Sequence, residues 1–246
     1  MLVSTCVTCF GQMEISIKLK NTPCDSIVIQ AFKDKKFSTL YAQPFSETVV
    51  FKSKTSLEPG MYNILADSNI QDVFIISSPK NQKFSILIDT NQNIYQGSPE
   101  NTKYHDFLLK IVEFNQQRAA LDKEYQDAQK SMPQYMLGVL ADSLTARAKR
   151  IAAEREKYQR QQIAANPNTL YAAIVSTTID IPEIPMEYYN DRYKIQKHII
   201  SHYFDNFPWN EPAIFNIPIG VDKIKEYCSM IYQIDNPDFD TLVVDA

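Results

Sequence analysis

The hydrophobic pattern of this chain changes its period at Ser98-Pro99-Glu100. Before this point apolar and polar residues alternate, as in residues 14–20, where Ile15, Ile17 and Leu19 fall on one face of a strand. After it, apolar residues recur at every third or fourth position, which is the spacing of an amphipathic helix. Strands first and helices afterwards predict the α+β class.

Residues 12–97 are predicted to form an antiparallel β-sandwich or barrel. Turn-forming sequences such as Glu58-Pro59-Gly60 separate short runs of high β propensity. About eight strands at this spacing are typical of a sandwich or barrel. The expected strands are residues 14–20, 26–32, 37–41, 48–52, 61–66, 72–77, 84–89 and 93–95.

Residues 98–165 are predicted to form a long αα-hairpin. Ser98 is a good N-cap, Pro99 suits the first helical turn, and Glu100 complements the helix dipole. An amphipathic stripe continues from there until Ser131-Met132-Pro133 interrupts it, and a second stripe follows. The short connection makes the two helices antiparallel neighbours with a partly coiled-coil seam.

The second of these helices carries a run of cations, which we interpret as a solvated helix face. A nucleic-acid site needs aromatic or groove-reading partners, and only Tyr158 lies nearby. The formal net charge of −4 also gives no reason to expect a nucleic-acid partner. The cations are Arg147, Lys149, Arg150, Arg155, Lys157 and Arg160.

Residues 166–246 are predicted to form a helical domain, with helices at 171–178, 188–203 and 221–232. Between the last two lies an aromatic- and proline-rich segment, residues 198–218, which contains Trp209. A segment this aromatic is expected to be a rigid, buried elbow, because burying rings offsets the entropy lost on ordering. The acidic cluster at 235–240 does not fit a calcium loop and is interpreted as a capping turn.

Several common classes of protein are excluded by composition. Only five glycines occur in 246 residues, and neither GxGxxG nor GxxxxGK[ST] can be written, so we expect no nucleotide cofactor, and no other cofactor is indicated. No apolar run approaches the roughly 20 residues that a membrane-spanning helix needs. The sequence gives no indication of oligomeric state or of ligand identity.

Residues 1–11 are interpreted as the tail of a secretory signal peptide, which places the protein in the periplasm or cell envelope. Leu2 to Phe10 are small and apolar, and Cys-Phe-Gly precedes Gln12, although no basic n-region comes first. Cys6-Val-Thr-Cys9 has the CxxC spacing of a redox pair, but a strand pattern follows it where a redox site has a helix. A lipid anchor on Cys6 is the third alternative.

His198, His202 and Asp205 are the candidate metal ligands. The two histidines are spaced i, i+4 and share one helical face, but the sequence between them lacks the glutamate of HExxH. We expect them to lie beside the aromatic elbow and to hydrogen-bond the backbone, without a metal. A triad of Ser201, His202 and Asp205 is not expected, because neighbours on one short stretch cannot line up as nucleophile, base and orienter.

Tyr188, Tyr189 and Tyr193 are a second candidate site. Exposed tyrosines concentrate at protein–protein interfaces, so these three side chains are consistent with a surface for a protein partner. Packing between helices is the default interpretation.

With these residues in view, the chain resembles the N-terminal half of the thiol:disulfide interchange (TlpA-like, thioredoxin-fold) proteins of the Bacteroidetes cell envelope. The resemblance implies a β-sandwich of unknown function, a long helical insert, a helical domain of unknown function and then a thioredoxin domain with the redox CxxC. It covers most of residues 12–246, in order. Its motifs are Leu57-Glu58-Pro59-Gly60-Met61-Tyr62, Gly97-Ser98-Pro99-Glu100-Asn101 leading into Tyr104-His105-Asp106-Phe107, and His202-Tyr203-Phe204-Asp205-Asn206-Phe207.

The resemblance implies a docking or scaffold role. No stretch of the sequence matches the family's thioredoxin domain, so no catalytic residue carries over, and we expect this chain not to be an enzyme by itself. Its expected partner is a protein or the missing C-terminal thioredoxin domain. The alternatives are a stand-alone periplasmic module that binds a ligand or partner, and a metal-dependent hydrolase that uses His202.

Overall fold

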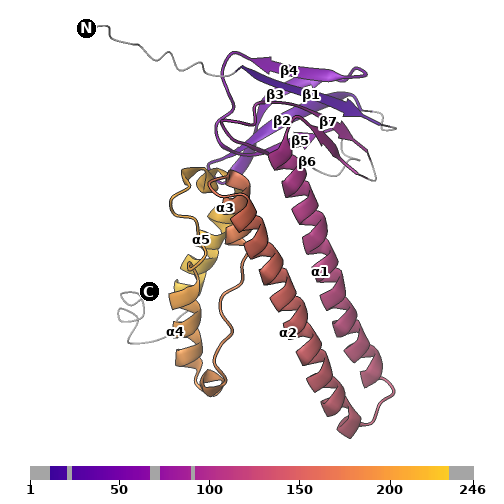
Figure 1. Cartoon of the computed structure of the whole chain (residues 1–246), viewed down its shortest axis with the longest axis vertical. Coiled ribbons are helices and arrows are strands. Elements are labelled where there is room, and N and C mark those ends of the chain that lie inside the picture. Colours follow the sequence, from indigo (N-terminus) through magenta and orange to yellow (C-terminus); the bar gives the residue numbers. More distant parts are fainter. Residues whose placement is uncertain (1–11, 21–23, 67–72, 90–91, 233–246) are drawn as a thin grey trace, which may run out of the picture. The chain divides into compact units, whose positions relative to one another are not determined.

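The computed structural model describes residues 12–20, 24–66, 73–89 and 92–232. The signal-peptide and Cys6/Cys9 interpretations, and that of the acidic segment at 235–240, lie outside this part. The fold is mixed α+β, as predicted, and Figure 1 shows strands in the first part of the chain and helices in the rest. Backbone contacts divide the chain into two compact units. The first contains the described residues up to Tyr104 together with Thr169–Tyr171 and Trp209–Glu226, and the second contains the others.

Eight strands occupy the positions that alternation predicted, within a few residues at each end. They form two four-stranded sheets, of order β4-β1-β7-β8 and β3-β2-β5-β6. The strands are β1 (Met13–Leu19), β2 (Ser26–Lys33), β3 (Lys36–Pro44), β4 (Val49–Ser53), β5 (Gly60–Leu65), β6 (Val73–Ser77), β7 (Lys83–Ile88) and β8 (Ile94–Gln96).

One pairing departs from the predicted antiparallel arrangement. β1 runs parallel to β7, with Ile15 opposite Phe84 and Ile17 opposite Ile86, whereas the other described pairings are antiparallel. A tight hairpin forces its two strands to be antiparallel, but β1 and β7 are far apart in the chain and are free of that constraint. Alternation shows which face a residue takes and not the direction of the neighbouring strand.

A single apolar core takes side chains from both sheets. Ile15 and Ile17 of β1 and Ile29 of β2 are fully buried in it, together with Ile64 of β5 and Ile75 of β6. Each fully buried aliphatic side chain contributes roughly 1.5–3 kcal/mol of hydrophobic stabilisation. The alternate residues of β1 face outward, as the sequence pattern predicted.

Two side-chain amides complete the backbone hydrogen bonding of this unit. Asn101 accepts a hydrogen bond from the Ile76 N–H (2.7 Å) and donates one to the Ile76 carbonyl (3.0 Å), as a neighbouring strand would. Gln82 does the same for Leu57: it accepts from the N–H at 2.8 Å and donates to the carbonyl at 3.2 Å. Both amides are buried, and therefore each satisfies polar groups that water cannot reach.

The predicted helix start at Ser98 is confirmed. The Ser98 hydroxyl accepts from the Asn101 N–H at 3.3 Å, as an N-cap does. Glu100 accepts from the Ser78 hydroxyl (2.7 Å) through one carboxylate oxygen and from the Tyr171 N–H (2.9 Å) through the other. This first turn therefore joins the loop after β6 to residue 171 within the first unit.

Tyr104, in the first turns of α1 (Pro99–Gln129), gives a prediction for alkaline pH. Burial raises the pKa of its phenol from 10.0 to about 12. As the pH rises, the unfolded chain releases this proton before the folded chain does. The contribution of the buried Tyr104 to the free energy of unfolding is therefore intact below about pH 10 and is lost as the pH rises to about 12. In urea titrations at pH 9.5 and 11.5, Tyr104→Phe should lose roughly 2 kcal/mol less of its free energy of unfolding than the wild type. Tyr135→Phe, at an exposed site, is the control, and a Tyr104→Phe slope equal to the wild type would contradict the assignment.

The described residues form five α-helices, which include both arms of the predicted hairpin. α1 and α2 have 31 and 32 residues, run antiparallel in Figure 1, and are separated by a turn ending at Pro133, where the sequence predicted the interruption. Leu121 of α1 packs with Leu144 and Ala148 of α2, and Arg147 donates to both carboxylate oxygens of Glu124. The remaining bounds are α2 (Gln134–Ala165), α3 (Leu170–Thr177), α4 (Arg192–His202) and α5 (Pro218–Tyr232).

Two helix predictions are corrected. The expected helix at 188–203 is broken: a 3₁₀ turn occupies Met186–Tyr188, and α4 starts afresh after Asp191, whose side chain accepts from the Lys194 N–H at 3.1 Å. α5 begins at Pro218 and not at residue 221, because proline's fixed φ suits the first position of a helix.

The aromatic elbow is buried only in part. Phe207 of the second unit is buried, and so are Ile214 and Ile217 of the first, within and just after the 3₁₀ segment Pro212–Asn216. Trp209, by contrast, is 58% exposed, so the expectation that this ring lies in a core is wrong. Phe207 and the buried aliphatic residues of the segment, and not its tryptophan, anchor it.

Candidate functional site

The candidate metal ligands lie together near the end of α4. His202 donates from Nδ1 to a carboxylate oxygen of Asp205 at 2.7 Å, and the rings of His198 and His202 are 4.6 Å apart between centroids. His198 donates from Nε2 to the Pro182 carbonyl at 3.1 Å and lies edge-on to Tyr188. The backbone hydrogen bond expected of these histidines is present at His198, whereas His202 bonds the Asp205 side chain. The aromatic neighbour of His198 is Tyr188, and not a Phe, Tyr or Trp ring of the elbow.

The arrangement of these groups does not form a metal or triad site. Across the described ranges no three His, Cys, Asp or Glu side chains are grouped so as to hold a metal ion. The Ser201 hydroxyl donates to the His198 carbonyl at 3.1 Å, so it is not oriented toward His202 as a nucleophile would be. His202 and Asp205 form a partly exposed hydrogen-bonded pair that joins α4 to the turn after it.

The three candidate tyrosines differ in their exposure to solvent. Tyr188 lies between His198 and the ammonium of Lys194, which is 6.0 Å from its ring centroid, and Tyr193 is half-buried. Tyr189 is exposed. Packing between neighbouring side chains therefore accounts for Tyr188 and leaves Tyr189 as an exposed ring.

The described thiols form no redox pair. Cys24 is half-buried and donates to the Ser26 carbonyl at 2.8 Å, while Cys228 is exposed on α5. Neither is in a disulfide within the described residues.

Four of the six cations of α2 are exposed, as predicted, whereas Arg147 and Arg155 are half-buried. Lys149 contacts Glu183 at 2.6 Å, Arg160 contacts Glu156 at 2.7 Å, and Arg155 is 3.8 Å from Asp180. Pairs this exposed contribute little stability, and their carboxylate partners reduce the positive potential of this face.

A groove between α1 and α2, which we call the hairpin groove, is a concave feature of the second unit. Its volume is about 670 Å³, within the range of binding clefts. Leu121, Leu144 and Ala148 form its apolar floor, and the residues around them include both charge signs. The lining residues are Arg118, Leu121, Asp122, Tyr125, Gln126, Ala141, Leu144, Thr145, Ala148, Lys149 and Ala152.

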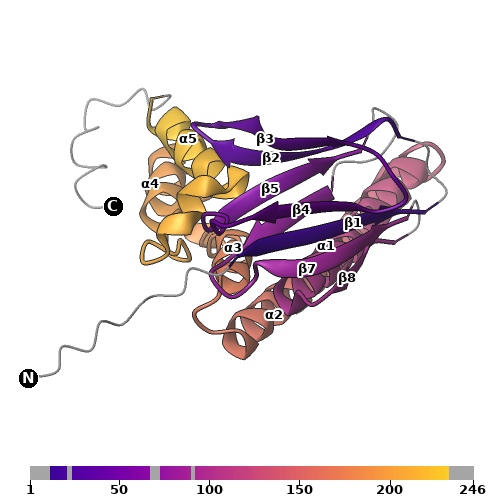
Figure 2. The ribbon, with the colours of Figure 1, turned by 90° about the horizontal axis from the view of Figure 1, so that it is seen from above.

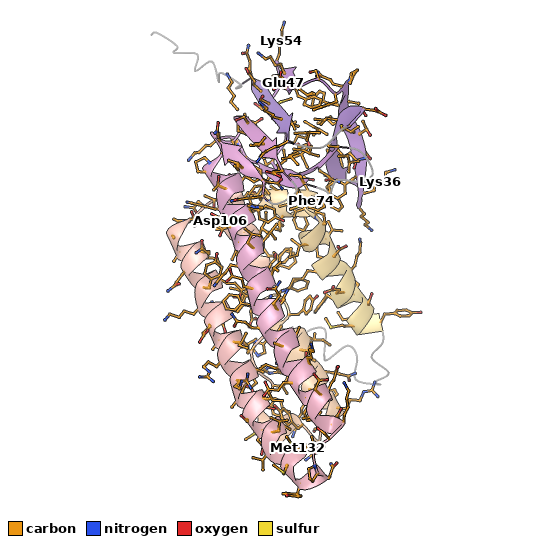
Figure 3. All side chains as sticks on the ribbon, turned by 90° about the vertical axis from the view of Figure 1, so that its right-hand side faces the viewer. Lys36, Glu47, Lys54, Phe74, Asp106 and Met132 are labelled. Carbon is orange, nitrogen blue, oxygen red and sulfur yellow. The ribbon has the colours of Figure 1, made fainter. Side chains whose placement is uncertain are left out.

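Two groups of exposed apolar side chains add to the surface of this helix pair. On α1 they are Leu108, Leu109 and Val112, where 108 and 112 are one helical turn apart. On α2 they are Tyr135, Met136 and Val139, close to the turn that contains Met132 at the end of the pair (Figure 3). Aromatic residues and methionine are enriched at protein interfaces.

The sequence indicated the two stripes but not the groove between them. A stripe of apolar positions predicts contact, whereas the space left between two helices depends on side-chain size. The signal was present in α2, where Ala141, Ala148 and Ala152 are small residues on the side facing α1. Three alanines opposite Leu121 and Tyr125 leave room that larger residues would fill.

No match was found when the chain was compared with models of known protein families, with curated proteins and with solved structures. Within the described residues no helix combines the length and the apolar character needed to cross a membrane.

Proposed function

We propose that this chain is the non-catalytic docking part of an exported thioredoxin-like thiol:disulfide oxidoreductase of the cell envelope. In this proposal the two sheets form a β-sandwich, α1 and α2 form a docking hairpin, and the helices from α3 onward form a helical domain. The hairpin groove is the observation that carries the docking role, and the family resemblance of the three sequence motifs supports the class of oxidoreductase.

The groove suits one amphipathic helix of a protein partner. Two long antiparallel helices leave a furrow along their seam, and a third helix placed there would complete a three-helix bundle. The apolar floor of Leu121, Leu144 and Ala148 would receive the partner's apolar stripe. Arg118 and Asp122, an exposed ion pair 3.8 Å apart at the rim, would present one charge of each sign to the flanks of that stripe.

The family assignment is tested by reading the gene beyond codon 246 and by an activity assay. An in-frame thioredoxin-like domain with a CxxC motif is expected downstream. In an insulin-reduction assay this 246-residue chain should be no faster than free dithiol at the same concentration. A stop codon with unrelated neighbouring genes would favour the stand-alone binding module, and robust turnover by the chain would contradict the non-catalytic role.

The docking role is tested by filling the groove. Thr145 is exposed and lines the groove, so Thr145→Arg should obstruct it without disturbing the buried floor. We expect binding of the downstream CxxC domain, added in trans and followed by calorimetry, to weaken at least about tenfold.

The matched control for this experiment is Ser143→Arg on the same helix. Ser143 is also exposed but does not line the groove. Its affinity should equal that of the wild type. Equal affinities for all three proteins would show that the partner binds elsewhere.

A further inference from the structure

Within the described residues, β3 is an edge strand of the sheet β3-β2-β5-β6. It pairs with β2 on one side only, and it is the outermost strand in Figure 2. Most of its nine residues are exposed along their length. The backbone N–H and C=O groups on its other side therefore face solvent, in a strand long enough to pair with another chain.

The interior of β3 lacks the charges that usually protect an edge. Natural edge strands are commonly protected by inward or central lysines, by proline or by bulges. Here Lys36 and Pro44 stand only at the two ends, and every residue from Phe37 to Gln43 is uncharged. One bulge is present: Ile29 pairs with Tyr41 and Gln30 with Thr39, which leaves Leu40 without an opposite residue on β2.

The bulge places an apolar side chain at the centre of the open edge. Leu40 is 43% exposed, in the middle of the strand. If β3 of a second copy pairs antiparallel with it about a two-fold axis at Tyr41, each Leu40 lies opposite Ala42 of the other copy, and the two Leu40 side chains are diagonal neighbours on one face. Such a pairing removes apolar surface from water in both copies at once.

The charges at the two ends of β3 are complementary in this pairing. Lys35 in the turn before the strand and Lys36 at its first position are basic. Glu47 follows the other end, has a side chain that is 90% exposed and lies 3.7 Å from Lys18. Lys36 and Glu47 lie toward opposite ends of the strand in Figure 3. An antiparallel pairing therefore brings the basic end of each strand toward the acidic end of the other.

The opposite edge of the same sheet is closed. There β6 has its Ile76 N–H and carbonyl paired with the Asn101 side chain, so a further strand cannot add at that position. An association through β3 therefore stops at two copies and does not continue into a fibre.

We infer that β3 is a homodimerisation edge, at which a second copy of this chain pairs antiparallel to form one continuous sheet across both copies. The inference is independent of the hairpin groove and goes beyond the proposed docking function. It assigns to the first unit an interaction that depends on backbone hydrogen bonds, on the central Leu40 and on the end charges.

The dimer is tested by sedimentation velocity of the full chain with Leu40→Lys. This change places like charges at diagonal positions beside the two-fold axis, which is destabilising in paired strands. The wild type should sediment at twice the mass of the chain, and the dissociation constant of Leu40→Lys should be at least about tenfold higher. Ile94→Lys is the matched control, because Ile94 is 44% exposed at an edge of the other sheet and should leave the dimer unchanged.

Hydrogen exchange separates this dimer from other associations. Amides of residues 36–44 should become more protected as the protein concentration rises, while those of residues 94–96 should not change. Charge reversal adds a second test: Glu47→Lys should weaken the dimer, and adding Lys35→Glu and Lys36→Glu should restore it. A monomer at every concentration, or a dimer equally sensitive to Leu40→Lys and Ile94→Lys, would overturn the inference.

Discussion

Asn101→Leu is expected to lower the free energy of unfolding by about 3 kcal/mol. Asn101 is 1% exposed and uses both ends of its amide on Ile76. Leucine has a similar size but no hydrogen-bonding group, so the Ile76 N–H would be buried without an acceptor. The Ile76 carbonyl would keep the hydrogen bond that it accepts from Asn81 at 2.9 Å, which limits the loss. The contact of the Asn101 amide with the Ser98 cap would also disappear.

Urea unfolding at neutral pH measures this loss, and a control on the same helix isolates its cause. Asn115→Leu makes the identical chemical change on the exposed face of α1 and should alter stability by no more than about 0.5 kcal/mol. If both variants were equally stable, the amide of Asn101 would not be closing the sheet edge. A large effect confined to Asn101 would assign the loss to the buried hydrogen bonds.

The strands of this protein could be predicted because one face of each is buried. Burial on one face makes alternate positions such as Ile15 and Ile17 apolar, and a pattern of that kind is local. The parallel pairing of β1 with β7 could not be predicted, because strand direction depends on connections that span most of the first unit. The hydrogen bond between the Asn101 side chain and the Ile76 backbone could not be predicted either, because no local sequence pattern identifies a side-chain amide that pairs with a strand.

The helices were predictable where a cap or a proline marks them. Ser98 and Pro133 gave the correct start of α1 and the correct break before α2. The break before α4 was missed because the apolar spacing continues through it, while the Asp191 side chain ends one segment and caps the next. Asp191 was present as a signal, but an aspartate inside a periodic stretch is not by itself a helix start.

The candidate sites could also be predicted from the sequence only in part. The i, i+4 spacing of His198 and His202 predicted that the two rings would be neighbours, and Asp205 lies within one further turn. The hairpin groove could not be predicted, because it depends on the fit between two helices that are joined only through a turn. Exposure of Trp209 was missed for a related reason: aromatic content indicates order but does not show which ring is covered.

Gly220→Ala is expected to destabilise the protein by about 2–4 kcal/mol, although alanine favours a helix over glycine. Gly220 is buried near the start of α5. A Cβ atom there would collide with the Ile214 carbonyl oxygen and would lie 2.9 Å from Ile214 Cγ1 and 3.0 Å from its carbonyl carbon. Because two of these atoms are backbone and Ile214 is fully buried, the strain cannot be relieved by rotating a side chain.

Gly138→Ala is the matched control and should change stability in the opposite direction. Gly138 is also helical, on α2, but a Cβ there meets nothing within 4 Å. The variant should therefore gain about 0.5–1 kcal/mol from the reduced backbone entropy of the unfolded chain. Urea unfolding of the two variants measures the difference, which should be at least about 2.5 kcal/mol if the approach of Ile214 decides the effect at Gly220. Two variants that are both more stable than the wild type would mean that the segment Pro212–Asn216 is not held against α5.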